Sequence, residues 1–230
     1  MKRICTALVA GLVLPGAAAA QRLPVSIGEE VVVTATRVPQ RVAQSNQHVT
    51  VITAGEIAAG GYQSVTEILQ ARGGLEITQS GGRGQPSAAS IRGAEPRHTL
   101  VLIDGLRVGS ATAGGTALEH IPVNQIDRIE IVPGPLSSVY GPDAVGGAIQ
   151  IFTPRGEGAG ARVEGGSFGT RGMSGYYGRR LGDTELSLSA GASATRGFDA
   201  SRSTLPFAQH HPDDDGYENH NFSARVNHDL

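Results

Sequence analysis

The sequence has little cysteine, little charge and no long hydrophobic run, and each absence excludes a class of protein. Its only cysteine, Cys5, lies in an N-terminal segment that we expect to be removed, so the mature chain would have no disulfide, no thiolate metal site and no cysteine nucleophile. The 19 basic and 21 acidic residues give a net charge of -2, which is not the clustered positive charge that nucleic-acid binding requires. A membrane-spanning helix needs about 20 apolar residues, and no apolar run beyond the N-terminal segment is that long. Residence in a membrane would therefore require a β-barrel.

The N-terminal segment has the pattern of a secretory signal peptide. Lys2 and Arg3 precede an apolar stretch from Ile4 to Leu14, and small residues end the segment at Ala18–Ala20, before Gln21. This order of cations, apolar core and A-x-A site is typical of a cleaved signal. We therefore expect the mature protein to lie beyond the inner membrane of a bacterium.

Residues 30–155 are predicted to form a compact α+β unit. Glycine makes up 33 of the 230 residues and tryptophan is absent, which favours short strands and turns over a helical bundle. Thr53 with Glu56 and Ser64 with Glu67 have the spacing of capping boxes, each opening a short helix. Besides a β-rich run at 49–52, strands are expected at Leu75–Gln79, Ser90–Arg92, Leu100–Asp104, Ile126–Val132 and Ala148–Thr153, with a hairpin turn at Asp104–Gly105.

The last third of the chain changes to strict alternation. In residues 184–194 the apolar side chains Leu186 and Leu188 alternate with Ser187 and Ser189, as in a strand with lipid on one side and polar packing on the other. A sheet of a soluble protein with one solvent-exposed face would give the same alternation. Strands are expected at Arg162–Phe168, Ser174–Arg180, Thr184–Ala194 and Phe222–Val226.

The connections between these strands are unequal. Leu181–Asp183 is a tight turn, whereas residues 195–221 form a long polar loop, and outer-membrane barrels alternate short turns with long loops in this way. Four strands are too few to close a barrel, whose smallest members have about eight. We therefore expect the chain to be the front of a larger protein.

Two motifs typical of metalloproteases and nucleotide-binding enzymes are absent from the sequence. It contains neither an H-E-x-x-H nor a G-K-[ST] motif. The loop histidines His210, His211 and His220 could bind a soft metal, but scattered histidines in loops are usually solvated. We expect a protein that is not an enzyme, either an active-transport receptor or a secreted binding module with an adhesive β tail.

A short β-branched heptad at residues 29–35 (Glu-Glu-Val-Val-Val-Thr-Ala) precedes the globular segment. It closely resembles a TonB box, the segment that TonB-dependent outer-membrane receptors offer to the energy-transducing protein TonB. The resemblance implies that TonB binds its seven residues, Glu29, Glu30, Val31, Val32, Val33, Thr34 and Ala35. An ordered series of motifs similar to those of the family's plug domain follows, at residues 73–77, 90–93, 101–105, 126–131 and 134–149.

The resemblance to TonB-dependent receptors implies a fold and a location. The fold class would be an α+β plug domain followed by the first strands of an antiparallel transmembrane β-barrel that is incomplete in this chain. The segments would be a signal peptide (1–20), a TonB box and linker (21–46), a plug (47–155) and about four barrel strands (156–230) with an acidic extracellular loop (195–221). The protein would lie in the bacterial outer membrane, with membrane lipid around it.

Within the family the sequence is most similar to cobalamin receptors, in the plug and in the acidic loop. By that resemblance, ligand would be bound by Pro86, Ala88, Glu95, Ala113 and Gly114, although most of these depart from the cobalamin pattern. Loop-bound Ca²⁺ would be held by Asp199, Asp213 and Asp215, with His211 at an oxygen-ligand position. Neutral imidazole is a poor Ca²⁺ ligand, and a solvated acidic loop is the alternative reading.

The function implied is TonB-dependent import of a scarce nutrient from the cell surface into the periplasm. The ligand would be a corrinoid, with cobalamin favoured and an iron–siderophore as the alternative, and no catalytic cofactor is expected. TonB and its inner-membrane energising complex would be the protein partners. Arg92, Arg128 and Glu130, expected to be buried, would fix the plug against carboxylates of the barrel wall. The alternative is a movable latch that TonB releases.

Overall fold

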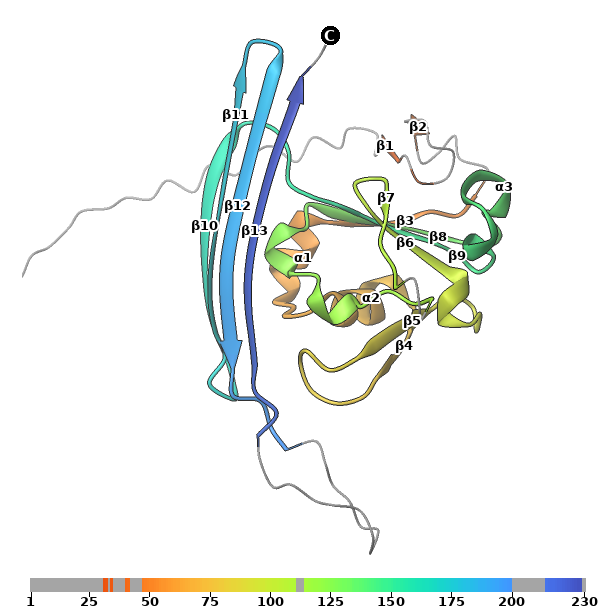
Figure 1. The fold of residues 1–230 in the computed structure, drawn as a ribbon, viewed down its shortest axis with the longest axis horizontal. Coiled ribbons are helices and arrows are strands. Elements are labelled where there is room, and N and C mark those ends of the chain that lie inside the picture. Colours follow the sequence, from red (N-terminus) through yellow and green to blue (C-terminus); the bar gives the residue numbers. More distant parts are fainter. Residues whose placement is uncertain are drawn as a thin grey trace, which may run out of the picture. The chain divides into compact units, whose positions relative to one another are not determined.

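The computed structural model describes residues 31–32, 34, 40–41, 47–110, 114–199 and 214–228 (Figure 1). All described residues belong to one compact unit, residues 31–230. Within them, no helix is both long and apolar enough to cross a membrane.

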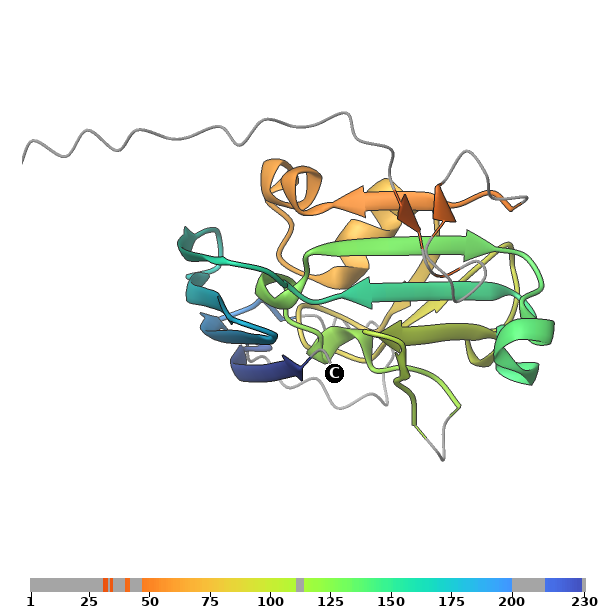
Figure 2. The same cartoon turned by 90° about the horizontal axis from the view of Figure 1, so that it is seen from above.

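A five-stranded sheet forms the centre of the globular segment, defined here as residues 47–155. Its order is β3, β8, β9, β6, β7, and only the β6–β9 pair is parallel. Figure 2 shows β3, β8, β9 and β6 side by side. The strands are β3 (Thr50–Thr53), β6 (Thr99–Ile103), β7 (Leu106–Arg107), β8 (Arg128–Pro133) and β9 (Gly147–Phe152).

Both faces of this sheet are buried, because alternate residues of its strands enter different apolar clusters. In β6, Val101 belongs to a large cluster with the helices, whereas Leu100 and Leu102 belong to a smaller one with Leu136 and Ala144. The apolar runs that predicted these strands are therefore core residues of a sheet covered on both sides.

Two capped helices cover one face of the sheet. α1 (Ala54–Gly60) begins at Thr53 with a complete capping box to Glu56. α2 (Val65–Gly73) begins at Ser64, whose side chain accepts from the Glu67 N–H. The second box is only half formed, because the Glu67 carboxylate accepts from the N–H of Gln63 instead.

The remaining elements before residue 156 are short. β4 (Glu76–Gln79) and β5 (Ser87–Ser90) form a separate antiparallel hairpin, and β1 (Val31–Val32) pairs with β2 (Gln40–Arg41). Single turns of helix are η2 (Pro96–His98), η3 (Leu118–His120), η4 (Val123–Gln125), α3 (Ser137–Tyr140) and η5 (Pro142–Ala144).

Of the strand predicted at Ser90–Arg92, only Ser90 belongs to a strand. β5 ends at Ser90, and the chain turns at Arg92 and Gly93, whose φ angles are 53° and 73°. Two consecutive left-handed residues cannot continue a strand. The local apolar pattern located the strand three residues late.

The second sheet is a four-stranded antiparallel meander. Its strands are β10 (Gly158–Gly165), β11 (Arg171–Leu181), β12 (Thr184–Thr195) and β13 (Tyr217–His228), in that order. β10 ends earlier than predicted, because Phe168 has a φ of 57° within a turn. β13 is longer than predicted at both ends. The two-residue turn after Leu181 is confirmed by the pairing of Leu181 with Thr184.

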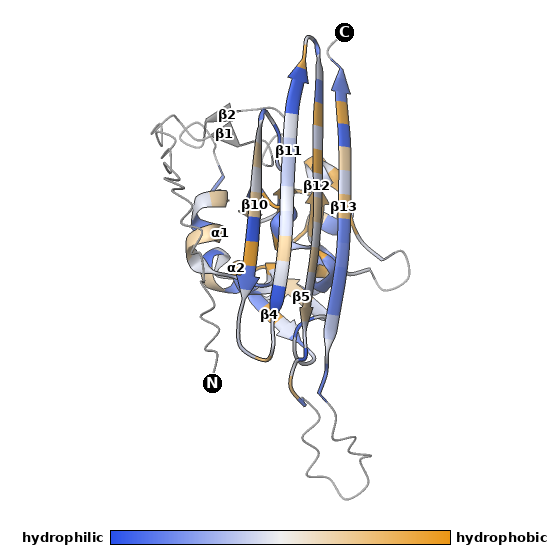
Figure 3. Ribbon diagram, turned by 90° about the vertical axis from the view of Figure 1, so that its left-hand side faces the viewer, coloured by the Kyte–Doolittle hydropathy of each residue, from blue (hydrophilic) through white to orange (hydrophobic). Residues whose placement is uncertain are grey.

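The two faces of this sheet differ in polarity, as the alternation predicted. Val163, Met173, Phe222 and Val226 are exposed on one face, and Figure 3 shows the alternation of hydrophobic and hydrophilic residues along β12 and β13. The other face contacts the globular segment through polar side chains, among them Asn221, whose amide oxygen accepts from Asn124 and Gln125. This is the arrangement of a barrel wall with lipid outside and a polar filling inside.

Candidate ligand-binding site

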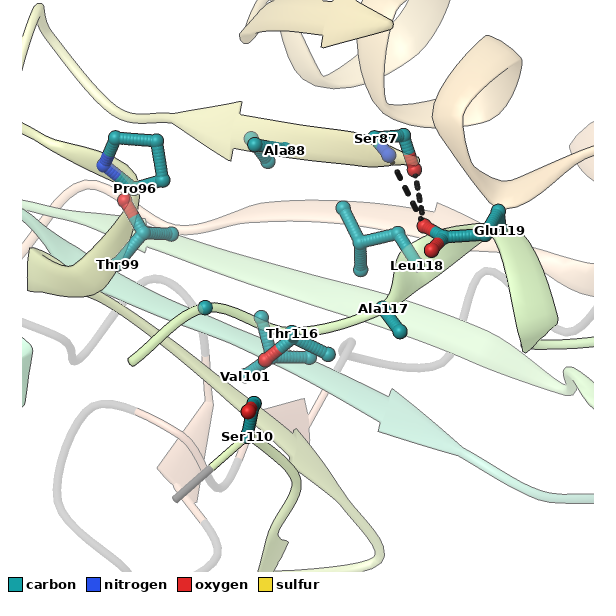
Figure 4. Close-up of a pocket in the computed structure, with 12 residues that line it drawn as sticks. Ser87, Ala88, Pro96, Thr99, Val101, Ser110, Thr116, Ala117, Leu118 and Glu119 are labelled. Atoms are coloured by element: carbon teal, nitrogen blue, oxygen red, sulfur yellow. Dashed lines mark hydrogen bonds between the residues drawn. The ribbon is translucent and has the colours of Figure 1, made fainter. Parts of the chain in front are cut away.

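A small pocket lies between β5, η2, β6 and η3 in the globular segment (Figure 4). Its volume is about 220 Å³. The residues around it are mostly small or hydroxylated: Ser87, Ala88, Ala89, Pro96, Thr99, Val101, Ser110, Gly115, Thr116, Ala117, Leu118 and Glu119.

The segments predicted to contact ligand meet at this pocket. Ala88 lines it, and the exposed Pro86 comes two residues earlier, just before β5. Pro96 lines it next to Glu95, and Gly115 lines it next to Gly114. Three segments separated in the sequence therefore surround one cavity.

Of the predicted ligand residues only Ala88 lines the pocket, and Glu95 and Gly114, like Pro86, lie just outside it. Glu95 is exposed and forms an ion pair with Arg97 at 2.5 Å. Gly114 packs against Arg97, because a Cβ added at Gly114 would lie 3.3 Å from the Arg97 Cβ, and it lines a neighbouring cavity of about 630 Å³. Ala113 lies outside the described residues.

Two polar residues of the pocket were not predicted from the sequence. The Glu119 carboxylate accepts from the Ser87 N–H at 3.1 Å and from the Ser87 hydroxyl at 2.7 Å. Thr99, at the start of the apolar strand β6, is only 6% exposed, and its hydroxyl has no hydrogen-bond partner in the described part of the chain. A single threonine or glutamate beside apolar residues gives no sequence signal. Only the fold places them together.

Tyr217 joins the second sheet to the rim of the pocket. Its hydroxyl donates to the Glu119 carbonyl at 3.3 Å, and the Arg83 guanidinium lies 5.7 Å from the centre of its ring. A Cβ at Gly84 would lie 2.1 Å from that ring, and the Gly84 φ is +83°, so glycine is required there. The start of β13 is thereby fixed against the β4–β5 hairpin.

The two ends of the acidic loop lie close together. A Cβ at Gly197 would lie 1.9 Å from the Asp215 carbonyl oxygen, and the Asp215 N–H donates to the Phe198 carbonyl at 3.3 Å. Of the predicted metal ligands, Asp199 and Asp215 are described, whereas His211 and Asp213 lie outside the described residues. In the described ranges, no three His, Cys, Asp or Glu side chains form a group that could hold a metal ion.

The N-terminal heptad is fixed to the central sheet by Thr34. The Thr34 N–H and hydroxyl donate to Glu130 Oε2 at 3.0 and 2.6 Å, and both residues are fully buried. Val31 and Val32 form β1, opposite Arg41 and Gln40. The other four members of the predicted TonB box, Glu29, Glu30, Val33 and Ala35, lie outside the described residues.

The expected cluster of buried Arg92, Arg128 and Glu130 is corrected by the structure. Arg92 is exposed, because its left-handed turn directs the chain away from the sheet. Arg128 is partly exposed, lies 3.7 Å from the centre of the Phe152 ring and donates to Glu130 Oε1 at 3.0 Å. Only Glu130 is buried, and it binds the N-terminal segment.

Asp104 connects the globular segment to the second sheet. Its carboxylate accepts from the Thr153 N–H and hydroxyl and forms ion pairs with Arg155 and with Arg225 of β13. Burial raises the pKa of Asp104, but these hydrogen bonds outweigh burial and hold the pKa below its ordinary value. Burial raises the pKa of the nearby Asp127, against the opposing charges of Arg128 and Arg155.

Replacing Asp104 by asparagine is expected to destabilise the chain at neutral pH and not at low pH. A carboxyl group with a lowered folded-state pKa contributes stability above its unfolded pKa of about 4 and loses it as the pH falls through the folded pKa. We expect the free energy of unfolding to fall by about 1–3 kcal/mol at pH 7. Most of this loss should come from the ion pair with Arg225, because the ion pair with Arg155 is half exposed and screened by solvent. Urea unfolding of both proteins at pH 7 and pH 3 measures this. An equal difference at both pH values would contradict it.

Comparison with known proteins identifies the family. Residues 41–148 match the family described as TonB-dependent Receptor Plug Domain. The chain is 42% identical over 129 residues to the vitamin B12 transporter BtuB of Vibrio vulnificus, covering 56% of the chain and 21% of that protein. It is 36% identical over 205 residues to BtuB of Photobacterium profundum, covering 87% of the chain and 33% of that protein. The chain thus spans a third or less of the length of these relatives.

Solved structures show the same fold. The pyoverdine outer membrane receptor FpvA of Pseudomonas aeruginosa superposes with a TM-score of 0.63 at 16% identity, covering 73% of this chain and 25% of that one. A ferric enterobactin receptor of the same species, PfeA, superposes with a TM-score of 0.59 at 22% identity, covering 81% of this chain and 32% of that one. The predicted fold class, a plug domain followed by barrel strands, is confirmed. The chain belongs to the TonB-dependent receptors of the bacterial outer membrane, a family of transporters and receptors, not of enzymes.

Proposed function

We propose that this chain belongs to a receptor that binds cobalamin at the cell surface and imports it into the periplasm. The observation that carries the proposal is the 36% identity to a vitamin B12 transporter over 87% of the chain. The pocket supports it, because the three segments predicted to contact the corrinoid surround one cavity. Its segments would be the signal peptide (1–20), box and linker (21–46), plug (47–155) and barrel strands (156–230). The acidic loop predicted at 195–221 would be limited to 196–216, because β12 ends at Thr195 and β13 begins at Tyr217.

Import across the outer membrane needs an external energy source, because no ATP is available there. We propose that TonB pairs with residues 29–35 by strand addition and supplies that energy. The extended conformation of Val31 and Val32 supports this proposal. Ligand would bind at the other end of the plug, through Pro86, Ala88, Glu95, Ala113 and Gly114.

An iron–siderophore receptor is the second candidate. The structural relatives FpvA and PfeA are complexes with pyoverdine and enterobactin, and the exposed Glu95–Arg97 pair beside the pocket would suit a charged chelate. Their identity to this chain is 16% and 22%, which shows the fold alone.

Binding of cyanocobalamin to outer membranes that contain the receptor tests the proposal. We expect saturable binding that no ferric siderophore displaces. Displacement of cyanocobalamin by a ferric siderophore, or the absence of binding, would favour the siderophore receptor.

Calcium removal should weaken cyanocobalamin binding about tenfold or more if Asp199, His211, Asp213 and Asp215 order the acidic loop. The physical reason is that adjacent carboxylates repel each other without a cation, and Tyr217 connects this loop to the pocket rim. Binding is measured with and without a chelator. The variant with Asp213→Asn and Asp215→Asn should lose the calcium dependence, whereas the control Asp183→Asn, in the opposite short turn, should retain it. Equal binding with and without the chelator would contradict a calcium site.

A further inference from the structure

The turn of the β4–β5 hairpin contacts both ends of the acidic loop. At one end, Phe198 lies against Gly82, because a Cβ added there would lie 3.5 Å from the Phe198 ring. At the other end, Tyr217, the first residue of β13, lies against Gly84, where any Cβ would overlap its ring. Two glycines of one turn therefore let side chains from both ends of the loop approach its backbone.

Arg83, between these two glycines, contacts both strands that carry the acidic loop. Its Nη2 donates to the Ser193 hydroxyl of β12 at 3.1 Å. Its guanidinium lies over the Tyr217 ring of β13, 5.7 Å from the ring centre. A cation in this position is attracted by the face of the ring. Arg83 thereby links the hairpin turn to β12 and to β13 at once.

The contacts of Tyr217 continue to the ligand pocket. The Tyr217 hydroxyl donates to the Glu119 carbonyl at 3.3 Å. The Glu119 carboxylate accepts from the N–H and the hydroxyl of Ser87 in the pocket wall (Figure 4). Ser87 is the first residue of β5, just after the turn that carries Arg83. The contacts therefore form a closed path from Arg83 through Tyr217 and Glu119 back to the same hairpin.

Stability alone does not account for an arginine at this position. The Arg83 Nη1 is buried and has no hydrogen-bond partner in the described part of the chain. A buried polar nitrogen without an acceptor is unfavourable. An unbranched apolar side chain would fill the same space without this cost, so the arginine points to a role other than stability.

We propose that Arg83 is a positioning residue that couples the ends of the acidic loop to the ligand pocket. Immobilising the loop ends fixes the Tyr217 ring, and through Glu119 the pocket wall, so the affinity for ligand rises. Because such a coupling is reciprocal, ligand in the pocket also immobilises the loop ends. The inference rests on the proposed function and deepens it, since it names the residue through which the proposed site is regulated.

Three substitutions separate positioning from stability. Arg83→Met keeps an unbranched side chain without the charge, and Arg83→Lys keeps the charge. Arg171→Met is the matched control, because Arg171 is exposed at the same end of the second sheet, on the face that carries Met173. In the intact receptor, Arg83→Met should weaken cyanocobalamin binding about tenfold and leave the urea midpoint nearly unchanged. Arg83→Lys should recover most of the affinity, and Arg171→Met should change neither value. Wild-type affinity in Arg83→Met would overturn the proposal.

A spin label at Asp214→Cys reports on the coupling directly. Asp214 is exposed at the second end of the loop and is not one of the proposed metal ligands. The label is placed in a receptor from which any other cysteine has been removed. Saturating cyanocobalamin should make the label less mobile in the wild type and leave its mobility unchanged in Arg83→Met. If the ligand immobilises the label equally in both, the coupling is wrong and the proposed function stands.

A second spectroscopic readout does not depend on cobalamin. Labels at Ser80→Cys, exposed next to the hairpin turn, and at Asp214→Cys give the distribution of distances between the turn and the loop end, by double electron–electron resonance without ligand. We expect a narrow distribution in the wild type and in Arg171→Met, and a broader one in Arg83→Met. If cyanocobalamin does not bind but the distribution broadens in this way, the proposed function fails and the positioning role of Arg83 stands. Equal widths in the wild type and Arg83→Met would overturn that role.

Discussion

Replacing Val32 by proline is expected to abolish nutrient uptake and to leave ligand affinity unchanged. Val32 pairs with Gln40 in β1–β2, and the proposed pairing with TonB needs the same backbone donors. Proline has no N–H and cannot contribute a donor to a strand ladder. The pocket is formed by residues 87–119 and receives nothing from β1. Uptake of labelled cyanocobalamin by cells, together with equilibrium binding to their outer membranes, measures the two effects separately.

The control for this experiment is Val32→Ala, which shortens the side chain and preserves the backbone N–H. We expect uptake by this variant to be close to that of the wild type. Loss of cyanocobalamin binding in Val32→Pro would contradict the assignment of the heptad and the pocket to different roles. Normal uptake by Val32→Pro would exclude residues 29–35 as the segment that TonB binds by strand addition.

The sequence predicted the fold wherever its signal was local. The Thr53–Glu56 capping box, the apolar runs of β6, β8 and β9, and the alternation in β12 each depend on neighbouring residues, and the structure contains all of them. The errors at Arg92 and Phe168 have one cause, since both residues adopt positive φ angles that an apolar pattern does not report.

The candidate site was predictable only in part. The resemblance to the family located the segments around Ala88, Pro96 and Gly115, because they lie at characteristic positions in the order of the plug motifs. It did not find Thr99 or Glu119, and the latter binds Ser87 across 32 residues of sequence. The Thr34–Glu130 contact spans 96 residues. Such pairs arise from sheet order and packing, which local periodicity does not encode.

Replacing Glu130 by glutamine should release the N-terminal heptad and destabilise the plug. Glu130 is fully buried, with Arg128 on Oε1 and Thr34 on Oε2. Removing one charge of a buried ion pair leaves the other without compensation, which typically costs about 3–5 kcal/mol. Because Arg128 is partly exposed, we expect a smaller loss of about 2–3 kcal/mol, measured by urea unfolding of the wild-type and variant receptors.

Release of the heptad can be measured separately from stability. Residues 21–230 contain no cysteine. In a receptor from which any other cysteine has been removed, a spin label at Val32→Cys therefore reports on this segment alone. In the Glu130→Gln background we expect the label to be more mobile than in the wild type. In the absence of ligand, the same cysteine should also crosslink more to TonB. Thr34→Val removes only the hydroxyl bond and preserves the ion pair with Arg128, so it should mobilise the label with little loss of stability. If the label is equally immobile in both variants, Glu130 stabilises the plug through Arg128 only, and the Thr34 contact does not control the access of TonB to the heptad.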